Sequence, residues 1–292
     1  MQAAAAQSVR FSPQEAFAYC GNLVRGHYEN FPVGSRLAPR RLRPHVHAVY
    51  AFARVADDFA DEGPDGVGRL ERLDDWERRL DGCLSGDADH PVFVALAETI
   101  RRFDLPDRLL RDLLDAFRQD CRVRRYDRFD GLLAYCRLSA NPVGRLVLHL
   151  YGHRDERMLA PSDAICSGLQ LANFWQDVAV DLRKDRIYLP AEDRARHGVS
   201  EEAVAEGRVD EGFRGLLGEL VGRTRRLFEE GRPLLGRVGG GLGLELRVVW
   251  LGGMRILDKI EEAGYDVFRR RPVLGASERA LLVGRALLGR PR

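Results

Sequence analysis

The chain has 292 residues, 45% of them hydrophobic, with 46 basic and 44 acidic side chains and a net charge of +2. This composition can bury a large core, and the balanced charge argues against a generic nucleic-acid-binding protein. The five cysteines lack CxxC spacing, which argues against a disulfide framework or a zinc knuckle and fits a reducing cytoplasm. No apolar signal segment or spanning run is found, so we expect a cytoplasmic protein.

Helical patterns follow one another along the chain. Ser12, Pro13 and Glu15 predict a first helix that ends near Phe31 and Pro32. A second helix is predicted to begin after Pro39 or Pro44 and to stop at 63–66. The later helices are predicted at 70–84, 91–103, 106–121, 129–151, 170–190, 211–237, 242–263 and from Ser277 onward.

Three interruptions are expected in this series of helices. Pro142 breaks the helix at 129–151, because proline lacks an amide hydrogen and clashes with the preceding turn. Residues 190–207 are polar and are predicted to be irregular. Gly239–Gly241 predicts a hinge, and Gly252–Gly253 predicts close helix packing.

The stretch 170–190, QLANFWQDVAVDLRKDRIYLP, reads as an apolar helix with one polar stripe. Asn173, Asp177 and Asp181 fall at i, i+4 and i+8, so a continuous helix places them one turn apart on one face. Hard oxygen ligands at this spacing suit Mg²⁺, which completes its shell with water and phosphate oxygens.

A second polar stripe lies in YAFARVADDFADE at 50–62, where Tyr50, Arg54, Asp57 and Asp61 recur at helical spacing beside Asp58. Arg54 and Asp58 are also spaced as an ordinary i,i+4 surface ion pair. Both stripes are embedded in apolar residues, and carboxylates on largely buried helices need partners.

Nearly every segment has helical period, so we predict an all-α fold that forms one domain over residues 1–292. Two acidic helices beside an apolar, aromatic cavity suit ionisation of an allylic diphosphate, because Mg²⁺ stabilises the departing diphosphate and ring faces stabilise a carbocation. Ordinary core packing is the alternative for each candidate ring. These rings are Tyr50, Phe52, Tyr135, Phe174, Trp175 and Tyr188.

Three segments resemble the squalene/phytoene synthase family of head-to-head isoprenoid synthases. They are YAFARVADDFADE at 50–62, YCRLSANPVG at 135–144 and the stretch at 170–190, in the family's order and spacing. The similarity runs from about His27 to Tyr265. It implies the isoprenoid synthase helical bundle with a central cavity, an isoprenoid diphosphate substrate and roughly two or three Mg²⁺ ions.

The same resemblance implies roles for individual residues. The implied metal ligands, which include the catalytic acids, are Asp57, Asp58, Asp61, Asn173, Asp177 and Asp181. The implied substrate contacts are Arg54 and Arg186 at the diphosphate, and Phe31, Tyr50 and Tyr188 along the cavity. Tyr135 is the implied participant in the cation chemistry.

Two motifs depart from the common family pattern. HYENFP at 27–32 replaces a basic, serine-rich run, so this diphosphate-facing stretch is less cationic. SANPVG at 139–144 replaces VAGxVG, and its Asn141 brings a group to the cavity wall that can bind substrate or orient water. Both motifs resemble the hopanoid-pathway branch, the hydroxysqualene synthases. This similarity implies ionisation of presqualene diphosphate and capture of the cation by water, which gives hydroxysqualene and diphosphate.

Two classes of function remain open from the sequence. The first class is an enzyme, for which a presqualene diphosphate, squalene or phytoene synthase is the alternative to a hydroxysqualene synthase. The second class is a non-catalytic lipid-binding or assembly factor, which would not need the acidic residues in register. No GxGxxG motif is present, so NADPH use is not expected. Reductive squalene synthases of this fold also lack the motif, and the alternative of NADPH use therefore stays open. A C30 product suggests peripheral contact with the inner membrane face. For the basic run at 36–43, diphosphate or membrane contact and a solvated loop are both open, and the oligomeric state is open too.

Overall fold

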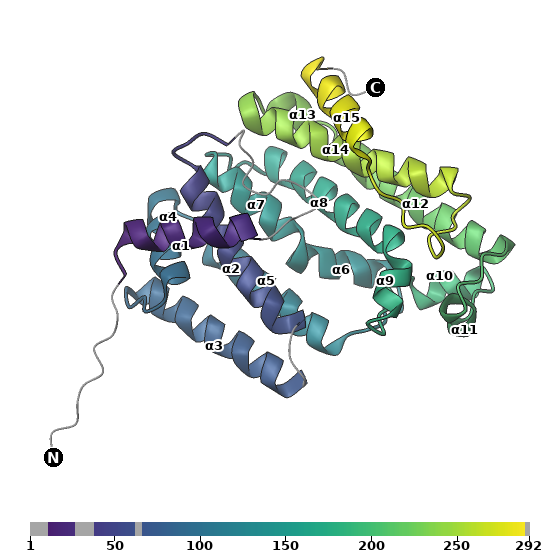
Figure 1. Ribbon diagram of the computed structural model, residues 1–292, viewed down its shortest axis with the longest axis horizontal. Helices are drawn as coiled ribbons and strands as arrows, with labels where there is room; N and C mark the ends of the chain where they lie inside the picture. The colour runs from purple at the N-terminus through teal and green to yellow at the C-terminus, as the bar shows by residue number, and fades with distance from the viewer. Residues whose placement is uncertain (1–10, 27–37, 62–65, 290–292) are drawn as a thin grey trace. The chain divides into compact units, whose positions relative to one another are not determined.

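The structure is a computed structural model that describes residues 11–26, 38–61 and 66–289 (Figure 1). Within these ranges it is built from helices without a strand, and its one β-type pairing is an isolated parallel bridge between Arg125 and Ile187. The predicted all-α fold is therefore confirmed. The predictions for Phe31, Arg36 and the HYENFP motif lie outside the described residues.

The helices follow each other closely along the chain. Their bounds are α1 (Pro13–Gly26), α2 (Arg43–Asp61), α3 (Gly66–Ser85), α4 (Pro91–Phe103), α5 (Asp107–Arg122), α6 (Phe129–Ser139), α7 (Asn141–Leu150), α8 (Glu156–Gln176), α9 (Val178–Leu182), α10 (Ala191–Arg196), α11 (Glu201–Ala205), α12 (Glu211–Gly231), α13 (Leu234–Arg237), α14 (Gly240–Glu262) and α15 (Ala276–Leu287).

Local signals in the sequence place several helix ends correctly. Ser12 and Glu15 cap α1 reciprocally, since each backbone amide donates to the other side chain, at 2.9 and 3.3 Å. The break at Pro142 is confirmed, because α6 ends at Ser139 and α7 begins at Asn141. Gly240 has a φ of 62° at the predicted hinge, a conformation that glycine adopts without strain.

Three predicted elements are wrong in extent. The helix expected at 170–190 ends at Gln176, and only the short helix α9 follows. The helix expected at 211–237 stops at Gly231, because Pro233 cannot donate within it, and α13 begins afterwards. Residues 190–207 are not irregular, since they form α10 and α11.

Contacts within the chain group these helices into two compact units. The first comprises residues 1–122 and 146–153, and the second comprises residues 123–145 and 154–292. The prediction of one domain over residues 1–292 stays a prediction.

In the first unit, α2 is the central helix and contacts α1, α3, α4 and α5. Its buried face carries Phe52, whose ring lies 6.2 Å from that of Trp76 and 6.0 Å from that of Phe93. Trp76 Nε1 also donates to the Phe52 carbonyl at 3.2 Å. The second half of α7 adds Leu146 and Leu150 to the same core. Phe52, a candidate ring of the cavity, is thus a core residue.

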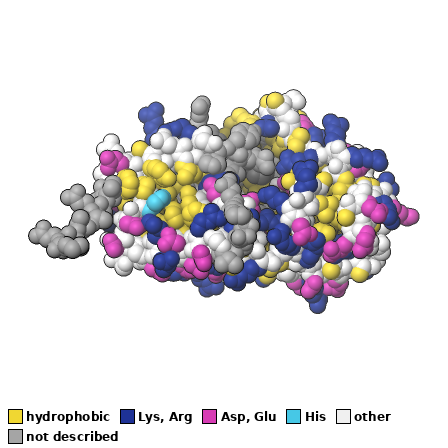
Figure 2. Space-filling model, turned by 60° about the horizontal axis from the view of Figure 1, so that its bottom comes forward, with side chains coloured by type: hydrophobic (Ala, Val, Ile, Leu, Met, Phe, Trp, Pro, Cys, Tyr) yellow, Lys and Arg dark blue, Asp and Glu magenta, His cyan; other side chains and the backbone are white. Residues whose placement is uncertain are grey.

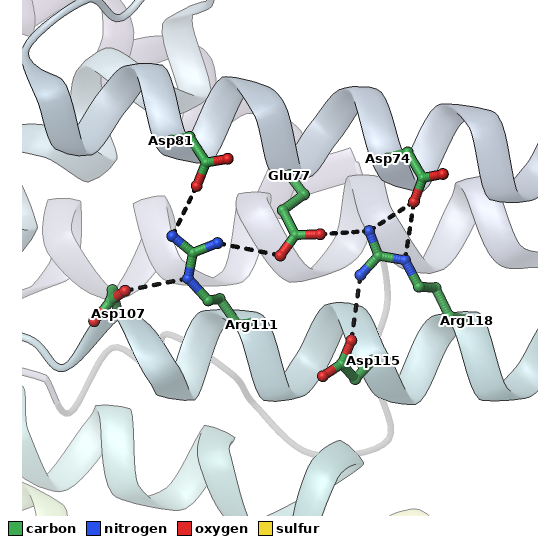
Figure 3. Close-up of polar contacts among 7 residues, drawn as sticks. All are labelled: Asp74, Glu77, Asp81, Asp107, Arg111, Asp115 and Arg118. Carbon is green, nitrogen blue, oxygen red and sulfur yellow. Dashed lines mark hydrogen bonds and ion pairs between the residues drawn. The ribbon is translucent and has the colours of Figure 1, made fainter.

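Two arginines join α3 to α5 by a ladder of ion pairs (Figure 3). Arg111 binds Asp81, Glu77 and Asp107, at 2.7, 3.1 and 3.2 Å. Arg118 binds the other oxygen of Glu77 at 2.6 Å and also pairs with Asp74 and Asp115. Networks of this kind are worth more than isolated surface pairs. The ladder therefore fixes α5 along α3.

In the second unit, α8 lies against α12, α14 and α6. Trp175 is fully buried, and its Nε1 donates to Thr224 Oγ1 of α12 at 2.8 Å. Phe228 of α12 fills the space left by Gly168 and Gly253, where added Cβ atoms would lie within 3.2 and 2.4 Å of its ring. Trp175 is therefore core, and the close packing predicted for the glycine pair is confirmed at Gly253.

Acidic and basic side chains are interspersed on the face drawn in Figure 2, as the balanced composition predicts. Among the described helices, none is both long and apolar enough to cross a membrane.

Candidate active site

The first acidic stripe lies on α2. The apolar side of this helix packs into the core, so Asp57 and Asp58 point away from the core. Both side chains are half-buried, and Arg54 lies between them. Arg54 Nη1 is 3.3 Å from Asp57 Oδ2, and Nη2 donates to Asp58 Oδ1 at 2.5 Å. Asp61, one turn further, is exposed. The ion pair expected as an alternative thus exists, and it offsets the repulsion of two adjacent carboxylates.

The second acidic stripe crosses the junction between α8 and α9. Asp177 is the C-cap of α8, with a φ of −105° and a ψ of 14°. The Asp177 amide still donates to the Asn173 carbonyl, and the Asp181 amide donates to the Asp177 carbonyl, both at 2.9 Å. The three residues therefore remain one turn apart even though the predicted continuous helix is interrupted.

The carboxylate of Asp177 is held by Arg271, a residue between α14 and α15. Nε of Arg271 donates to Oδ1, and Nη2 donates to Oδ2 at 3.1 Å, which makes the contact bidentate. These hydrogen bonds raise the pKa of Arg271 above its usual value. Next to this pair, the buried Gln176 amide donates to the Pro272 carbonyl. Two successive residues of the 271–272 segment thus bind the carboxyl end of α8.

The chain after α9 is fixed by residues 124–127. Arg125 donates to both the carbonyl and the carboxylate of Asp185, at 2.5 and 2.8 Å, and this guanidinium lowers the pKa of Asp185. The Ile187 amide donates to the Arg124 carbonyl, and the Ala191 amide donates to the Tyr126 carbonyl, both at 2.9 Å. These bonds flank Tyr188 and set its position. They also explain why the helix predicted at 170–190 does not continue.

Four buried aromatic rings gather where these segments meet α6 and α8. Phe174 and Tyr188 stack with ring centroids 3.7 Å apart and an interplanar angle of 9°. Tyr126 stacks on Tyr188 at 5.8 Å, and Tyr135 closes the group at 5.9 Å from Tyr126 and 6.1 Å from Phe174. We call these four residues the ring cluster. Phe174 lies three residues before Asp177, so the cluster and the second acidic stripe share one helix end.

Asn141 joins three helices. With its amide oriented so that both polar groups are satisfied, its nitrogen lies 3.3 Å from the Cys136 carbonyl of α6, and 3.1 Å from the Asp163 carbonyl and 2.9 Å from Ser167 Oγ of α8. The three contacts of the Asn141 amide nitrogen stabilise the break between α6 and α7. Substrate binding by Asn141 stays a prediction.

Burial raises the pKa of Cys136 and of neighbouring Cys166 to about 12, so neither thiol is a nucleophile at neutral pH.

The donor chemistry of the two stripes fits Mg²⁺. Among the described residues, no three His, Cys, Asp or Glu side chains form a ligand group by themselves. Mg²⁺ does not need such a group, because it binds one or two carboxylates and keeps water and phosphate oxygens. In this structure Arg54 and Arg271 supply the positive charge at Asp57, Asp58 and Asp177.

The site residues predicted from the sequence divide between the units. Tyr50, Arg54, Asp57, Asp58 and Asp61 lie on α2 in the first unit. The second unit holds Tyr135, Asn141, Asn173, Asp177, Asp181, Arg186 and Tyr188.

A sequence profile described as squalene/phytoene synthase matches residues 24–278. The chain belongs to the squalene/phytoene synthase family. This is a family of enzymes, head-to-head prenyl transferases that use isoprenoid diphosphates.

Several relatives within the family show how far the similarity extends. The chain is 37% identical to the hydroxysqualene synthase of Rhodopseudomonas palustris over 236 residues, 80% of each chain. It is 33% identical to the phytoene synthase of Arthrospira platensis, over 88% of this chain and 87% of the other. The crystal structure of squalene synthase HpnC from Alicyclobacillus acidocaldarius superposes with a TM-score of 0.83 at 41% identity, over 88% of this chain and 97% of that one.

Two residues of the site have no clear signal in the sequence. Arg271 lies 94 positions from Asp177, within a basic run that also fits a solvated loop. Tyr126 precedes the helix that carries Tyr135, and its stacking on Tyr188 depends on the bridge between Arg125 and Ile187. In both cases the pairing is formed by distant parts of the sequence, so local periodicity does not reveal it.

Proposed function

We propose that the chain is a Mg²⁺-dependent isoprenoid synthase that converts presqualene diphosphate and water to hydroxysqualene and diphosphate. The observation that carries the proposal is the shared helix end of α8, where Asn173, Asp177 and Asp181 lie beside the ring cluster. Such an end can place a diphosphate near oxygen ligands and its isoprenoid chain near aromatic faces.

The reaction that we propose begins when the carbon–oxygen bond to diphosphate breaks and the leaving group takes the electron pair. Bound Mg²⁺ would supply charge that stabilises this departing group. The proposed metal ligands of the second unit are Asp177 and Asp181, and those of the first unit are Asp57 and Asp61. Arg54 and Arg186 are the proposed diphosphate contacts.

The rings then act on the carbocation. Tyr135, Phe174 and Tyr188 are the proposed rings that stabilise positive charge and exclude bulk water while the cation rearranges. Because Phe174 and Tyr188 cover one face of each other, each of these two rings would act through its other face. One water molecule adds to the rearranged cation and transfers a proton to the released diphosphate, so the alcohol oxygen comes from water. Asn141 is the proposed residue that orients this water. No hydride donor is needed in this sequence, and we therefore propose that NADPH is not used.

The similarity to a hydroxysqualene synthase supports this product. The similarity to phytoene synthases supports a second candidate, head-to-head condensation of two prenyl diphosphates.

Isotope labelling separates these reactions. Purified protein is incubated with presqualene diphosphate and Mg²⁺ in H₂¹⁸O without NADPH, and the expected product is a C30 alcohol that contains one ¹⁸O atom. Parallel incubations contain farnesyl or geranylgeranyl diphosphate. Phytoene from geranylgeranyl diphosphate, or presqualene diphosphate as the end product from farnesyl diphosphate, would overturn the proposal. No turnover of any of the three would favour the non-catalytic alternative.

A further inference from the structure

The carboxyl-terminal helix α15 has two faces of different character. Leu282 and Ala286 are buried and pack the helix on α14. The opposite side exposes Leu281, Leu287 and Leu288, whose accessible fractions are 56%, 65% and 81%. These are large values for leucine, and apolar side chains gathered on an exposed face mark interaction surfaces.

The outward face of α15 is also uncharged along its centre. At 3.6 residues per turn, Ala280 and Gly284 lie between Leu287 on one side and Leu281 with Leu288 on the other. Val283, 41% exposed, borders the same face. We call Ala280, Leu281, Val283, Gly284, Leu287 and Leu288 the outward face.

Positive charge lies along both edges of the outward face. Arg279 and Arg285 are exposed, and helical spacing places them on opposite edges, next to the buried side. Glu278, the one acid of α15, is turned toward α14, where its carboxylate accepts hydrogen bonds from Lys259 at 2.8 and 3.0 Å and from Arg255 at 3.1 Å. These contacts lower the pKa of Glu278 to about 2. The acid is thus neutralised internally, and the arginines set the charge of the edges.

A cavity of about 380 Å³ lies at the carboxyl end of the same helix. Gly289, directly after the exposed Leu288, lines it together with Arg232 and Arg247. Glu229 also lines the cavity and pairs with Arg232 at 3.2 Å, while Arg247 donates from Nε to the Ala286 carbonyl at 3.1 Å. The Arg247 contact ties α15 to α14, and the cavity brings further guanidinium charge close to the end of the outward face.

We propose that the outward face of α15 docks on an anionic phospholipid bilayer. An apolar strip with arginines on both edges matches the boundary between acyl chains and acidic headgroups. With 12 residues α15 is too short to span a bilayer, so the helix lies in the plane of the interface. A second copy of the chain fits less well, because a two-fold contact would bring the same arginine edges together. The proposal does not depend on which isoprenoid product is made.

The test uses the full-length protein and sedimentation with vesicles. Vesicles of phosphatidylglycerol mixed with phosphatidylcholine are compared with vesicles of phosphatidylcholine alone, and binding is expected only to the anionic vesicles. Replacing both Leu281 and Leu288 by Gln should weaken this binding at least about tenfold, since each leucine contributes apolar burial. Arg285→Gln should weaken it about fivefold, because one basic residue near an anionic surface contributes about 1 kcal/mol.

Matched controls make the same chemical changes elsewhere. Leu84→Gln changes a leucine of α3 that is 40% exposed, and Arg108→Gln changes an arginine of α5 whose side chain is 88% exposed. Both controls should bind vesicles as the wild type does, and all variants should keep the wild-type melting temperature.

Three results would overturn the proposal. The first is equal binding to both kinds of vesicle, and the second is wild-type binding by the double leucine variant. The third is a wild-type dimer in size-exclusion chromatography that does not bind vesicles and that the double variant dissociates, because a second copy would then cover the face.

Discussion

Arg271 holds Asp177 through two hydrogen bonds: Nε donates to one carboxylate oxygen, and Nη2 donates to the other. The oxygens that would coordinate a cation are therefore already bound to a positive side chain. Because a guanidinium and a divalent ion compete for the same lone pairs, metal binding at Asp177 requires this ion pair to open or to share an oxygen. The Arg271–Asp177 ion pair thus connects the segment after α14 to the acidic stripe of α8 and α9.

Arg271→Gln should raise the affinity of the protein for Mn²⁺ in the absence of diphosphate by roughly five- to tenfold. The reason is that removal of the competing guanidinium charge makes the free energy of Mn²⁺ binding at this partly exposed site more favourable by about 1 to 1.4 kcal/mol. Isothermal titration calorimetry measures the effect. Arg269→Gln is the control, since this neighbouring side chain is 89% exposed. An unchanged Mn²⁺ affinity in Arg271→Gln would show that Asp177 is not a cation ligand in the free protein.

Asp57→Asn should lower kcat/KM at least about 100-fold and leave the melting temperature nearly unchanged. The change removes charge from the proposed metal site, whereas the side chain is 40% exposed and its 3.3 Å contact with Arg54 contributes about 1 kcal/mol or less to stability. Steady-state kinetics and a thermal melt are measured together. Asp74→Asn, which makes the same change in the α3–α5 ladder, should keep full activity. Full activity of Asp57→Asn would exclude a catalytic role for Asp57.

Tyr135→Phe should lower kcat about tenfold or change the product distribution, with KM within about threefold of the wild type. Tyr135 is buried in the ring cluster, so loss of its hydroxyl group alters the surroundings of the cation more than the binding of diphosphate. Product analysis by gas chromatography accompanies the kinetics. Tyr19→Phe, at an exposed position of α1, is the matched control. Identical rate and products in Tyr135→Phe would make Tyr135 a packing residue.

The sequence predicts features that depend on neighbouring residues. The cap at Ser12, the break at Pro142 and the spacing of Asn173, Asp177 and Asp181 arise from backbone chemistry and helical period, and the structure contains all three. The helix end at Gln176 is different, because the following chain bonds to Arg124 and Arg125, some 60 residues away. Such tertiary pairing overrides the helical pattern, and no local signal reveals it.

Gly→Ala changes at two glycines should have opposite effects, because Gly253 lies at the close contact between α14 and α12 whereas Gly222 faces open space. At Gly253 a Cβ would lie 2.4 Å from Phe228 Cζ, so Gly253→Ala should destabilise the protein by about 1–3 kcal/mol. A Cβ added at Gly222 would have no described side chain or other segment of the chain within 4 Å, so Gly222→Ala should stabilise α12 by about 0.5–1 kcal/mol. Urea denaturation of both variants measures the difference. A stabilised Gly253→Ala would contradict this packing.

Stability should fall as the pH is lowered from about 5 toward 2, in part through Glu219. His197 Nε2 lies 2.8 Å from this carboxylate, and Arg223 and Arg196 also pair with it, which lowers the pKa of Glu219 to about 2. An unfolded glutamate takes up its proton near its usual pKa of 4.5, so below that pH the unfolded chain binds more protons and the stabilisation decreases.

Melting temperatures between pH 7 and pH 3 test this assignment. Glu219→Gln should lower the melting temperature at pH 7 by a few degrees and should reduce its fall with pH. Glu211→Gln at the start of α12 is the control, and it should keep the wild-type dependence. A dependence in Glu219→Gln equal to that of the wild type would assign the acid sensitivity to other carboxylates.

The core of the first unit is not contiguous along the chain. Leu146 and Leu150 complete it, yet they follow residues 123–145, which belong to the second unit. During synthesis, α1 to α5 therefore leave the ribosome with part of their apolar surface uncovered until α7 has been translated. A fragment that ends at Arg122 would lack both leucines and expose the surface that they cover. The core of the first unit is consequently completed by a piece of chain that is made after the second unit has begun.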